Sequence, residues 1–152
     1  MIVKSPELDP LALAMLGLAF ERAEMPAGAV SILCGIGSDL GARLVQSAQV
    51  DQIVFTGSVP TGQSILRSAA GPVTPTLMEL GGKSAAVVFE DANLDSLIQS
   101  LKSGIFYNAG QVCSAMSRVL VHRSLYDEVV ERAVALSTGL SVDHGLDNPD
   151  HT

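Results

Sequence analysis

The stretch "QIVFTGSVPTGQSILRSAAGPVTPTLMEL", residues 52–80, contains the pattern that decides the fold. It opens with a short apolar run that ends at a glycine, which is typical of a buried strand. Ser58 then stands where a helix N-cap is needed, and Pro60 is tolerated because it falls in the first turn. We expect this helix to reach about Ala70 and a second strand to form in "TPTLMEL". A strand, a helix and a strand at this spacing predict a parallel βαβ unit.

The same alternation continues on both sides of this stretch. Asp9 and Asp91 are placed to cap two further helices, and Pro10 suits the first position of the helix after Asp9. A glycine-rich turn at residues 35–41 precedes another helix. Outside residues 52–80, we expect strands at 29–34, 84–90 and 118–122, and helices at 10–25, 42–48, 94–106 and 124–137. The sequence therefore predicts an α/β fold of parallel βαβ units, with helices on the faces of the sheets.

The composition is that of a folded protein without a basic surface. Its 152 residues suffice for one compact domain or for two incomplete halves of a larger protein. Apolar residues make up 47% and aromatic residues 4%, so the core is expected to consist of Ala, Val, Leu and Ile. A formal charge of -7 and the lack of a Lys/Arg cluster exclude nucleic acid and anionic membranes as partners. The most apolar run, residues 11–20, is about half the ~20 residues that a membrane-spanning helix needs.

The cysteines and histidines indicate reduced thiols and no metal site. The first residues lack the basic region of a secretion signal, and Cys34 and Cys113 are far apart in the sequence. We therefore expect free thiols in a cytoplasmic protein, with Cys34 buried at the end of a strand. His122, His144 and His151 are scattered without metal-ligand spacing, so we expect no metal site.

Polar or glycine-rich groups are expected after predicted strands at three places, which is where open α/β sheets hold ligands. At the first place, Gly57 and Ser58 form a turn whose N–H groups could hold a phosphate, although a glycine turn with a serine cap explains them equally well. At the second place, Glu79 precedes two glycines and is either a catalytic base or a solvated carboxylate. The third place is the loop of Cys113. The turn at 35–41 lacks the spacing of the dinucleotide fingerprint.

The local sequence leaves the role of Cys113 open between a nucleophile and a packed thiol. A cysteine is a useful nucleophile only where its surroundings favour the thiolate or an adjacent base removes the proton. No histidine is near Cys113 in the sequence, which disfavours a protease-like Cys–His pair. The wider pattern of motifs has to decide between the two roles.

Taken in order and spacing, these segments resemble the aldehyde dehydrogenase superfamily. "IVKSPE" is similar to the family's "VVKPSE", and "FTGSVPTG" is similar to its "FTGSxxxG". "MELGGKSAAVVFEDANLD" resembles "LELGGKSPxIVxxDADLD", and "NAGQVCSAMSR" resembles "NxGQxCxAxSR". The resemblance runs from about Ile2 to Ser137, and it favours the nucleophile over the packed thiol at Cys113.

The resemblance implies a covalent reaction at Cys113. In the family, the cysteine of "GQxC" attacks the aldehyde carbon, and the thiohemiacetal then gives a hydride to the nicotinamide. The glutamate of "ELGGK" activates the water that hydrolyses the resulting thioester. The match assigns these two roles to Cys113 and Glu79, so the expected activity is oxidation of a small-molecule aldehyde to a carboxylic acid.

The resemblance also implies a site for NAD. The lysine and glutamate of the family's "KPSE" bind the adenosine ribose, and the match gives these roles to Lys4 and Glu7. A carboxylate at Glu7 would repel a 2′-phosphate, so NAD is favoured over NADP, which remains an alternative. Ser58 would reach the pyrophosphate. The cofactor-binding residues implied by the resemblance are Lys4, Glu7, Gly37, Gly41, Phe55, Thr56, Gly57, Ser58, Gly62 and Leu80.

The matched motifs divide the chain between parts of two Rossmann-like domains. Residues 1–80 correspond to a partial NAD-binding domain, residues 81–140 to a partial catalytic domain, and residues 141–152 to a polar loop or tail. The family's "PWNxP" and "EEIFGP" segments do not occur in the 152 residues, so the isolated chain is expected not to turn over aldehyde. Sheet surface left uncovered is expected to drive self-association or homo-oligomer formation.

Two alternative functions stay open at this point. The chain could be a non-catalytic dehydrogenase-like module that binds a nucleotide or a partner, which the missing asparagine of "PWNxP" favours and the retained Cys113 and Glu79 disfavour. An acylating dehydrogenase that passes the acyl group to coenzyme A is the other alternative. Glu79 weakens it, because such enzymes commonly lack the hydrolytic base.

Overall fold

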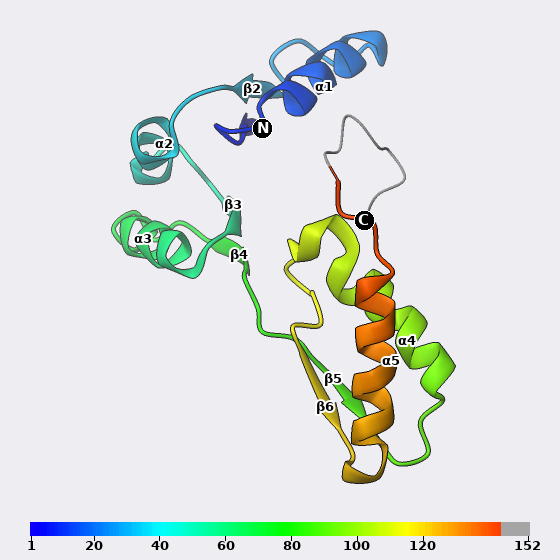
Figure 1. The fold of residues 1–152 in the computed structure, drawn as a ribbon. Helices are drawn as coiled ribbons and strands as arrows, with labels where there is room; N and C mark the ends of the chain where they lie inside the picture. The colour runs from blue at the N-terminus through cyan, green and yellow to red at the C-terminus, as the bar shows by residue number, and fades with distance from the viewer. Residues whose placement is uncertain (144–152) are drawn as a thin grey trace. The chain divides into compact units, whose positions relative to one another are not determined.

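The computed structural model describes residues 1–143, which divide into two units, Met1–Leu80 and Gly81 onward (Figure 1). Within these residues the strands pair two by two, and each pair is parallel. The pairs are β1 (Ile2–Lys4) with β2 (Ser31–Leu33), β3 (Ile53–Gly57) with β4 (Thr76–Leu80), and β5 (Ala85–Val88) with β6 (Arg118–Val121). The helices that connect the strands of each pair are α1 (Leu11–Arg22), α3 (Val59–Ala70) and α4 (Leu94–Leu101). The expected α/β fold of parallel βαβ units is confirmed.

Further helical segments lie between the first two βαβ units, within the crossover from β5 to β6, and after β6. They are α2 (Ala42–Gln46), α5 (Tyr126–Thr138), π-helical turns at Gly37–Gly41 and Lys102–Phe106, and 3-10 turns at Tyr107–Gly110 and Arg123–Leu125. Residues 141–143 belong to no helix or strand, and the remainder of the predicted tail lies outside the described residues.

The beginning of the chain differs from the sequence-based expectation. The sequence pattern does not predict β1, which is only three residues long. α1 begins at Leu11 with Pro10 in the N-cap position and no capping side chain, so the expected cap by Asp9 is wrong. α1 also ends at Arg22, earlier than predicted, because Glu24 takes a left-handed φ of 52°.

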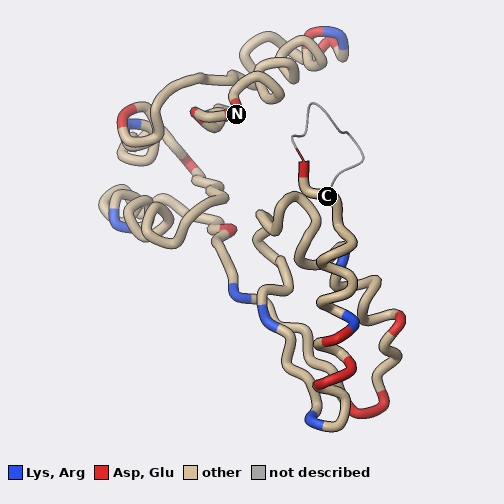
Figure 2. Tube along the Cα trace, viewed as in Figure 1, with Lys and Arg blue, Asp and Glu red and all other residues tan. Residues whose placement is uncertain are grey.

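The surface carries charges of both signs on each unit. Lys and Arg residues are spread along the chain instead of following one another in one cluster (Figure 2). Among residues 1–143, no helix combines the length and the apolar character that a membrane span requires.

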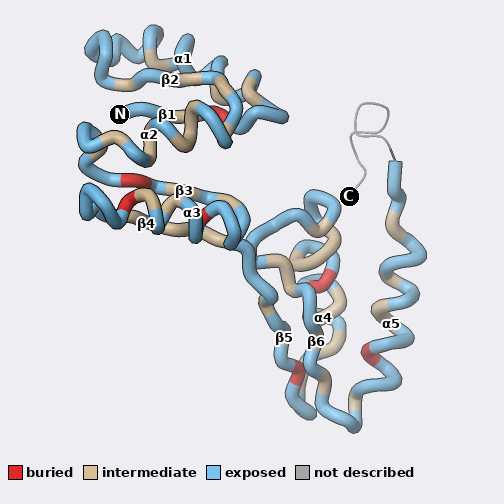
Figure 3. The backbone as a smooth tube through the Cα atoms, turned by 90° about the vertical axis from the view of Figure 1, so that its left-hand side faces the viewer, coloured by how far each residue is buried: buried red, intermediate tan, exposed pale blue. Residues whose placement is uncertain are grey.

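The first unit buries a small apolar core on one side of β3 and β4 (Figure 3). α3 lies against both strands, and Ile53 and Ala69 are buried. The opposite face is open to solvent, because the cross-strand partners Val54 and Leu77 are 64% and 50% exposed. Parallel sheets are generally covered on both faces, so this face is an uncovered apolar surface.

The second unit has the same arrangement. α4 and α5 lie on one side of β5 and β6 (Figure 1), and Val88, Leu101 and Val129 are buried. On the other side, the cross-strand partners Val87 and Leu120 are 58% and 52% exposed. Each unit therefore has helices on one face of a strand pair and exposed apolar side chains on the other.

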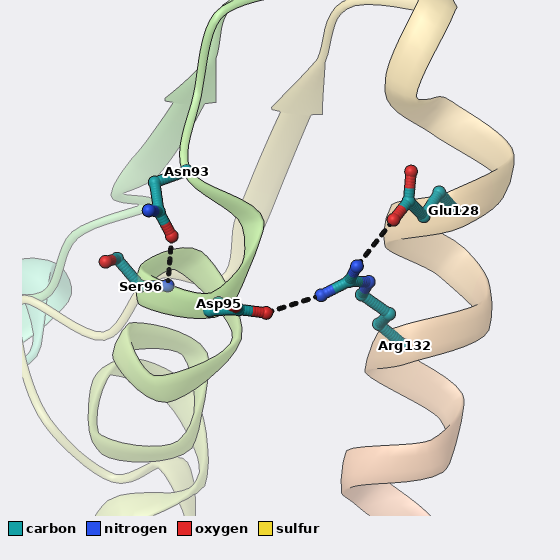
Figure 4. A network of polar contacts seen from close by, with 5 residues as sticks. All are labelled: Asn93, Asp95, Ser96, Glu128 and Arg132. Carbon is teal, nitrogen blue, oxygen red and sulfur yellow. Dashed lines mark hydrogen bonds and ion pairs between the residues drawn. The ribbon is translucent and has the colours of Figure 1, made fainter.

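Of the three crossover helices, α3 and α4 have a side-chain N-cap, whereas α1 has none. The Ser58 hydroxyl accepts the backbone N–H of Thr61 at 3.3 Å, which confirms the predicted cap of α3. At the start of α4, the Asn93 side-chain oxygen accepts the backbone N–H of Ser96 at 2.9 Å (Figure 4). The expected cap by Asp91 is therefore wrong, because Asn93 stands directly before the first helical residue.

Arg132 joins the two helices of the second unit (Figure 4). From α5 its guanidinium donates to Asp95 of α4 at 2.7 Å and to Glu128 of α5 at 2.6 Å. The pKa of Arg132 is raised above its ordinary value, mainly by the hydrogen bond with Glu128 and next by the hydrogen bond with Asp95. These groups are solvent-exposed, so the ion pairs orient α4 against α5 and contribute little to the free energy of unfolding.

Replacing Asn93 by Ala should destabilise the second unit, because it leaves a backbone N–H at the start of α4 without an acceptor. We expect Asn93→Ala to lower the free energy of unfolding by about 1 kcal/mol. Asp91→Ala is the matched control, since it removes a nearby acidic side chain that makes no cap. Urea denaturation of the two variants should therefore separate them, and equal losses would contradict the assignment of the cap.

Candidate functional site

Lys4, Glu7 and Gly37 meet where β1 and β2 end. The Glu7 carboxylate accepts the backbone N–H of Gly37 at 2.6 Å, although the two residues are 30 positions apart. The Lys4 ammonium lies 3.9 Å from the same carboxylate oxygen. Parallel pairing of β1 with β2 places their carboxyl ends at one edge, which explains why these residues converge.

The chemistry of this Lys4–Glu7–Gly37 cluster fits a sugar diol. A carboxylate accepts hydrogen bonds from hydroxyl groups, and an ammonium donates hydrogen bonds to them. A Cβ atom on Gly37 would lie 3.6 Å from the Glu7 carboxylate and 3.7 Å from the Lys4 ammonium, so the absence of a side chain keeps the cluster accessible. The cluster therefore has the donor and acceptor set that the ribose of NAD requires.

Within residues 1–143, no hydrogen bond links the other predicted cofactor residues of the first unit to this cluster. Gly41 ends the π-helical turn. Apart from its chain neighbours and its own helix, no atom of residues 1–143 comes within 4 Å of the position that its Cβ would take. The Ser58 hydroxyl caps α3 and is also hydrogen-bonded to the Thr61 hydroxyl at 2.9 Å. Gly62 is buried against Leu80, since a Cβ on Gly62 would lie 2.8 Å from the Leu80 side chain.

Glu79 and Thr56 lie on the exposed face of the β3–β4 pair. They are cross-strand partners, two positions beyond the pair Val54 and Leu77, and therefore on the same face. Within residues 1–143, the Glu79 carboxylate makes no hydrogen bond or ion pair, so it is free to bind a water molecule. Phe55 and Gly57 lie at positions of the other face, where the Phe55 ring is close to Gly57.

Cys113 follows a strained left-handed turn in the second unit. Asn108, Ala109 and Gly110 have φ values of 52°, 54° and 74°. The turn is closed by two hydrogen bonds, from the Gln111 N–H to the Asn108 carbonyl at 3.0 Å and from the Asn108 side-chain amide to the Gln111 carbonyl at 3.2 Å. Left-handed conformations of non-glycine residues cost energy and are enriched at functional sites.

The backbone N–H of Cys113 is available to donate a hydrogen bond to a reacting oxygen atom. The Cys113 thiol is exposed, and its backbone N–H makes no hydrogen bond within the described residues. Such an N–H group beside a nucleophile can stabilise the oxyanion that forms when a thiolate attacks a carbonyl. Cys113 lies before β6, which corrects the expectation that its loop follows a strand.

Cys34 also departs from expectation. Its thiol is exposed instead of buried, and it accepts a hydrogen bond at 3.4 Å from the hydroxyl of Ser5, which is fully buried. No group of three or more His, Cys, Asp or Glu side chains within residues 1–143 could hold a metal ion. His144 and His151 lie outside the described residues.

Asn108 is a feature of the site that the local sequence analysis does not single out. The signal for it is the combination "NAG", because Asn and Gly are the residues that most readily adopt left-handed conformations. The hydrogen bond from its amide to Gln111 makes Asn108 part of the loop that presents Cys113.

Comparison with known proteins gives one consistent result. The model of the aldehyde dehydrogenase family matches residues 1–152. The chloroplastic betaine aldehyde dehydrogenase of Atriplex hortensis is 38% identical over 141 residues, which cover 93% of this chain and 28% of that protein. The mitochondrial aldehyde dehydrogenase family 2 member B4 of Arabidopsis thaliana is 42% identical over 135 residues, 88% of this chain and 25% of that protein.

Solved structures give the same result. An NAD+ complex of aldehyde dehydrogenase from Bacillus cereus has a TM-score of 0.89 and 39% identity, over 92% of this chain and 28% of that one. A betaine aldehyde dehydrogenase from Staphylococcus aureus in complex with NAD+ has a TM-score of 0.90 and 32% identity. The match covers 95% of this chain and 28% of that one. The chain thus spans 25% to 29% of the curated relatives and solved chains that it matches.

The left-handed turn before Cys113 generates a stability prediction. Ala109→Gly should raise the free energy of unfolding by about 0.5–1 kcal/mol, because glycine adopts positive φ without the steric cost that alanine carries. The matched control is Ala135→Gly in α5. This change should lower the free energy of unfolding by about 1 kcal/mol, because Ala135 is helical and glycine disfavours a helix. Urea denaturation measures both changes. A loss of stability in Ala109→Gly would contradict the strain assigned to the turn.

Proposed function

The chain belongs to the aldehyde dehydrogenase family, and on this premise we propose that it supplies the nucleophile, the hydrolytic base and part of the cofactor site for NAD-dependent oxidation of an aldehyde. The observation that carries the proposal is the exposed Cys113 thiol with a free backbone N–H at the end of a strained turn. The activity of the whole protein is a proposal, because the chain spans only 25% to 29% of the length of its relatives.

Cys113 and Glu79 divide the proposed chemistry between them. The Cys113 thiolate attacks the aldehyde carbon, and the developing oxyanion accepts a hydrogen bond from the Cys113 N–H. A bound NAD would supply the hydride acceptor for oxidation of the thiohemiacetal to the thioester. Glu79 then removes a proton from the water that hydrolyses the thioester. The exposed and unpaired carboxylate of Glu79 supports this role, because it can accept a proton from water.

The Lys4–Glu7–Gly37 cluster supports NAD as the cofactor. The Lys4 ammonium and the Glu7 carboxylate would bind the hydroxyl groups of the adenosine ribose. The negative charge of Glu7, held by the N–H of Gly37, would repel the 2′-phosphate of NADP. Two similar solved structures contain NAD+, which agrees with this preference.

The remaining assignments stay proposals. The residues proposed for the cofactor beyond the cluster are Gly41, Phe55, Thr56, Gly57, Ser58, Gly62 and Leu80. The first unit is proposed as part of the NAD-binding domain, and the second as part of the catalytic domain. A cytoplasmic location also stays a prediction, since curated relatives include chloroplastic and mitochondrial proteins.

The uncovered strand faces support self-association. Val54 and Leu77 in the first unit, and Val87 and Leu120 in the second, form apolar pairs that no helix covers within the described residues. Apolar surface and unpaired strand edges attract a further copy of the chain or another segment that can cover them. We therefore include a homo-oligomer in the proposal.

Glu7→Gln should weaken the preference for NAD over NADP by roughly tenfold, because it removes the charge that repels the 2′-phosphate while keeping the size of the side chain. Isothermal titration calorimetry with both dinucleotides measures the ratio of dissociation constants. Glu21→Gln on α1 is the control, since it makes the same charge change outside the cluster. An unchanged ratio in Glu7→Gln, or failure of the parent chain to bind NAD, would contradict the cofactor assignment.

The 152 residues by themselves should not turn over aldehyde at a steady rate. The family's asparagine of "PWNxP" is not among them, and loss of one oxyanion donor costs about 10²–10³ in rate. The assay follows NADH formation from short and aromatic aldehydes, while light scattering is expected to give a mass above the 15.8 kDa of one chain. Steady turnover by a monomer that Cys113→Ala abolishes would overturn both expectations.

A further inference from the structure

The segments before β5 and β6 are held together by the pairing of these strands. The Arg118 N–H donates to the Ser84 carbonyl at 3.2 Å. The Arg118 guanidinium also clamps the Lys83 carbonyl, with hydrogen bonds of 3.1 Å from Nε and 2.6 Å from Nη2. The glycines that precede Lys83 are therefore brought against the loop that precedes Arg118, which contains Cys113.

Gly82 approaches the backbone of that loop closely. A Cβ atom on Gly82 would lie 3.0 Å from the backbone carbonyl oxygen of Cys113, which is tighter than an ordinary van der Waals contact. A carbonyl oxygen cannot rotate away as a side chain can, so the Cys113 peptide would have to shift by a few tenths of an ångström. Around the neighbouring Gly81, no atom of residues 1–143 other than those of its chain neighbours lies within 4 Å of the Cβ position. Only one of the two adjacent glycines is therefore required by the loop.

We propose that Gly82 is a positioning residue for Cys113. Because Gly82 has no side chain, the Cys113 carbonyl can pack directly against the segment before β5. This proposal rests on the function proposed above for Cys113. The other side of the loop is held by the hydrogen bond from the Met116 N–H to the Gly104 carbonyl at 2.9 Å. The carbonyl, the side chain and the N–H of Cys113 are joined at one Cα atom, so a shift of the carbonyl should also move the thiol and the free N–H.

The consequence concerns reactions that form an oxyanion. A thiolate that attacks a carbonyl needs the Cys113 N–H within hydrogen-bond reach of the developing negative charge. A thiolate that displaces iodide from iodoacetamide forms no oxyanion and does not need this donor. A shift of the Cys113 peptide should therefore slow acylation of the thiol more than its alkylation, whereas general loosening of the structure would change both rates together.

The test compares acylation and alkylation of Cys113 in the 152-residue chain. With p-nitrophenyl acetate, the thiolate attacks the ester carbonyl, a carbon–sulfur bond forms, the ester carbon–oxygen bond breaks and p-nitrophenolate leaves. Peptide mass spectrometry separates the modification of Cys113 from that of Cys34. Gly82→Ala is expected to slow acylation of Cys113 about tenfold and to leave its alkylation by iodoacetamide within about twofold. Gly81→Ala, the matched control, should leave both rates unchanged.

The outcomes separate this inference from the proposed function. If Cys113 in the parent chain is acylated no faster than Cys34, the function proposed for Cys113 fails. The role of Gly82 fails if Gly82→Ala leaves the ratio of acylation to alkylation unchanged, or if Gly81→Ala lowers it equally. If Gly82→Ala does not fold, the same two rates are measured in Arg118→Lys. This variant keeps the positive charge but loses the paired hydrogen bonds from the guanidinium to the Lys83 carbonyl. A lowered ratio in Arg118→Lys supports the proposal, and an unchanged ratio overturns it.

Discussion

Parallel pairing of strands is the constraint on which the rest of this structure depends. Two parallel strands cannot be joined by a tight turn, so each pair here requires a crossover that contains a helix. The pairing also places equivalent ends of both strands at the same edge. At the carboxyl edge of β1 and β2 this brings Glu7 to Gly37, and at the amino edge of β5 and β6 it brings Gly82 to Cys113. The Lys4–Glu7–Gly37 cluster and the contact of Gly82 with Cys113 are thus each a consequence of strand pairing within one unit.

The same pairing leaves surface that a stable parallel sheet would cover. In each unit helices lie on one face, and apolar cross-strand partners such as Val54 with Leu77 face solvent on the other. Parallel sheets are usually covered on both faces by the helices of their crossovers. The chain spans 25% to 29% of its curated relatives, so these relatives contain many residues that have no counterpart in the two units described here.

The sequence predicted the elements well where apolar runs and Gly or Pro set clear limits, as in β3, α3 and β4. It failed for the cap of α4, because Asp91 and Asn93 are both good capping residues and only the helix start decides between them. Cys113 and Glu79 were singled out locally, but their roles came from the family resemblance. The close approach of Gly82 to Cys113 could not be predicted, because it depends on the pairing of two strands that are far apart in the sequence.

The most direct test of the central claim is a titration of the isotope-labelled chain with NAD, followed by the backbone amide signals in nuclear magnetic resonance. If parallel pairing of β1 and β2 builds the dinucleotide site, the largest shifts will fall on Glu7 and Gly37, and the amides of α4 and α5 will be unaffected. Shifts confined to α4 and α5, or no shift at any amide, would contradict the claim that this strand edge binds the cofactor.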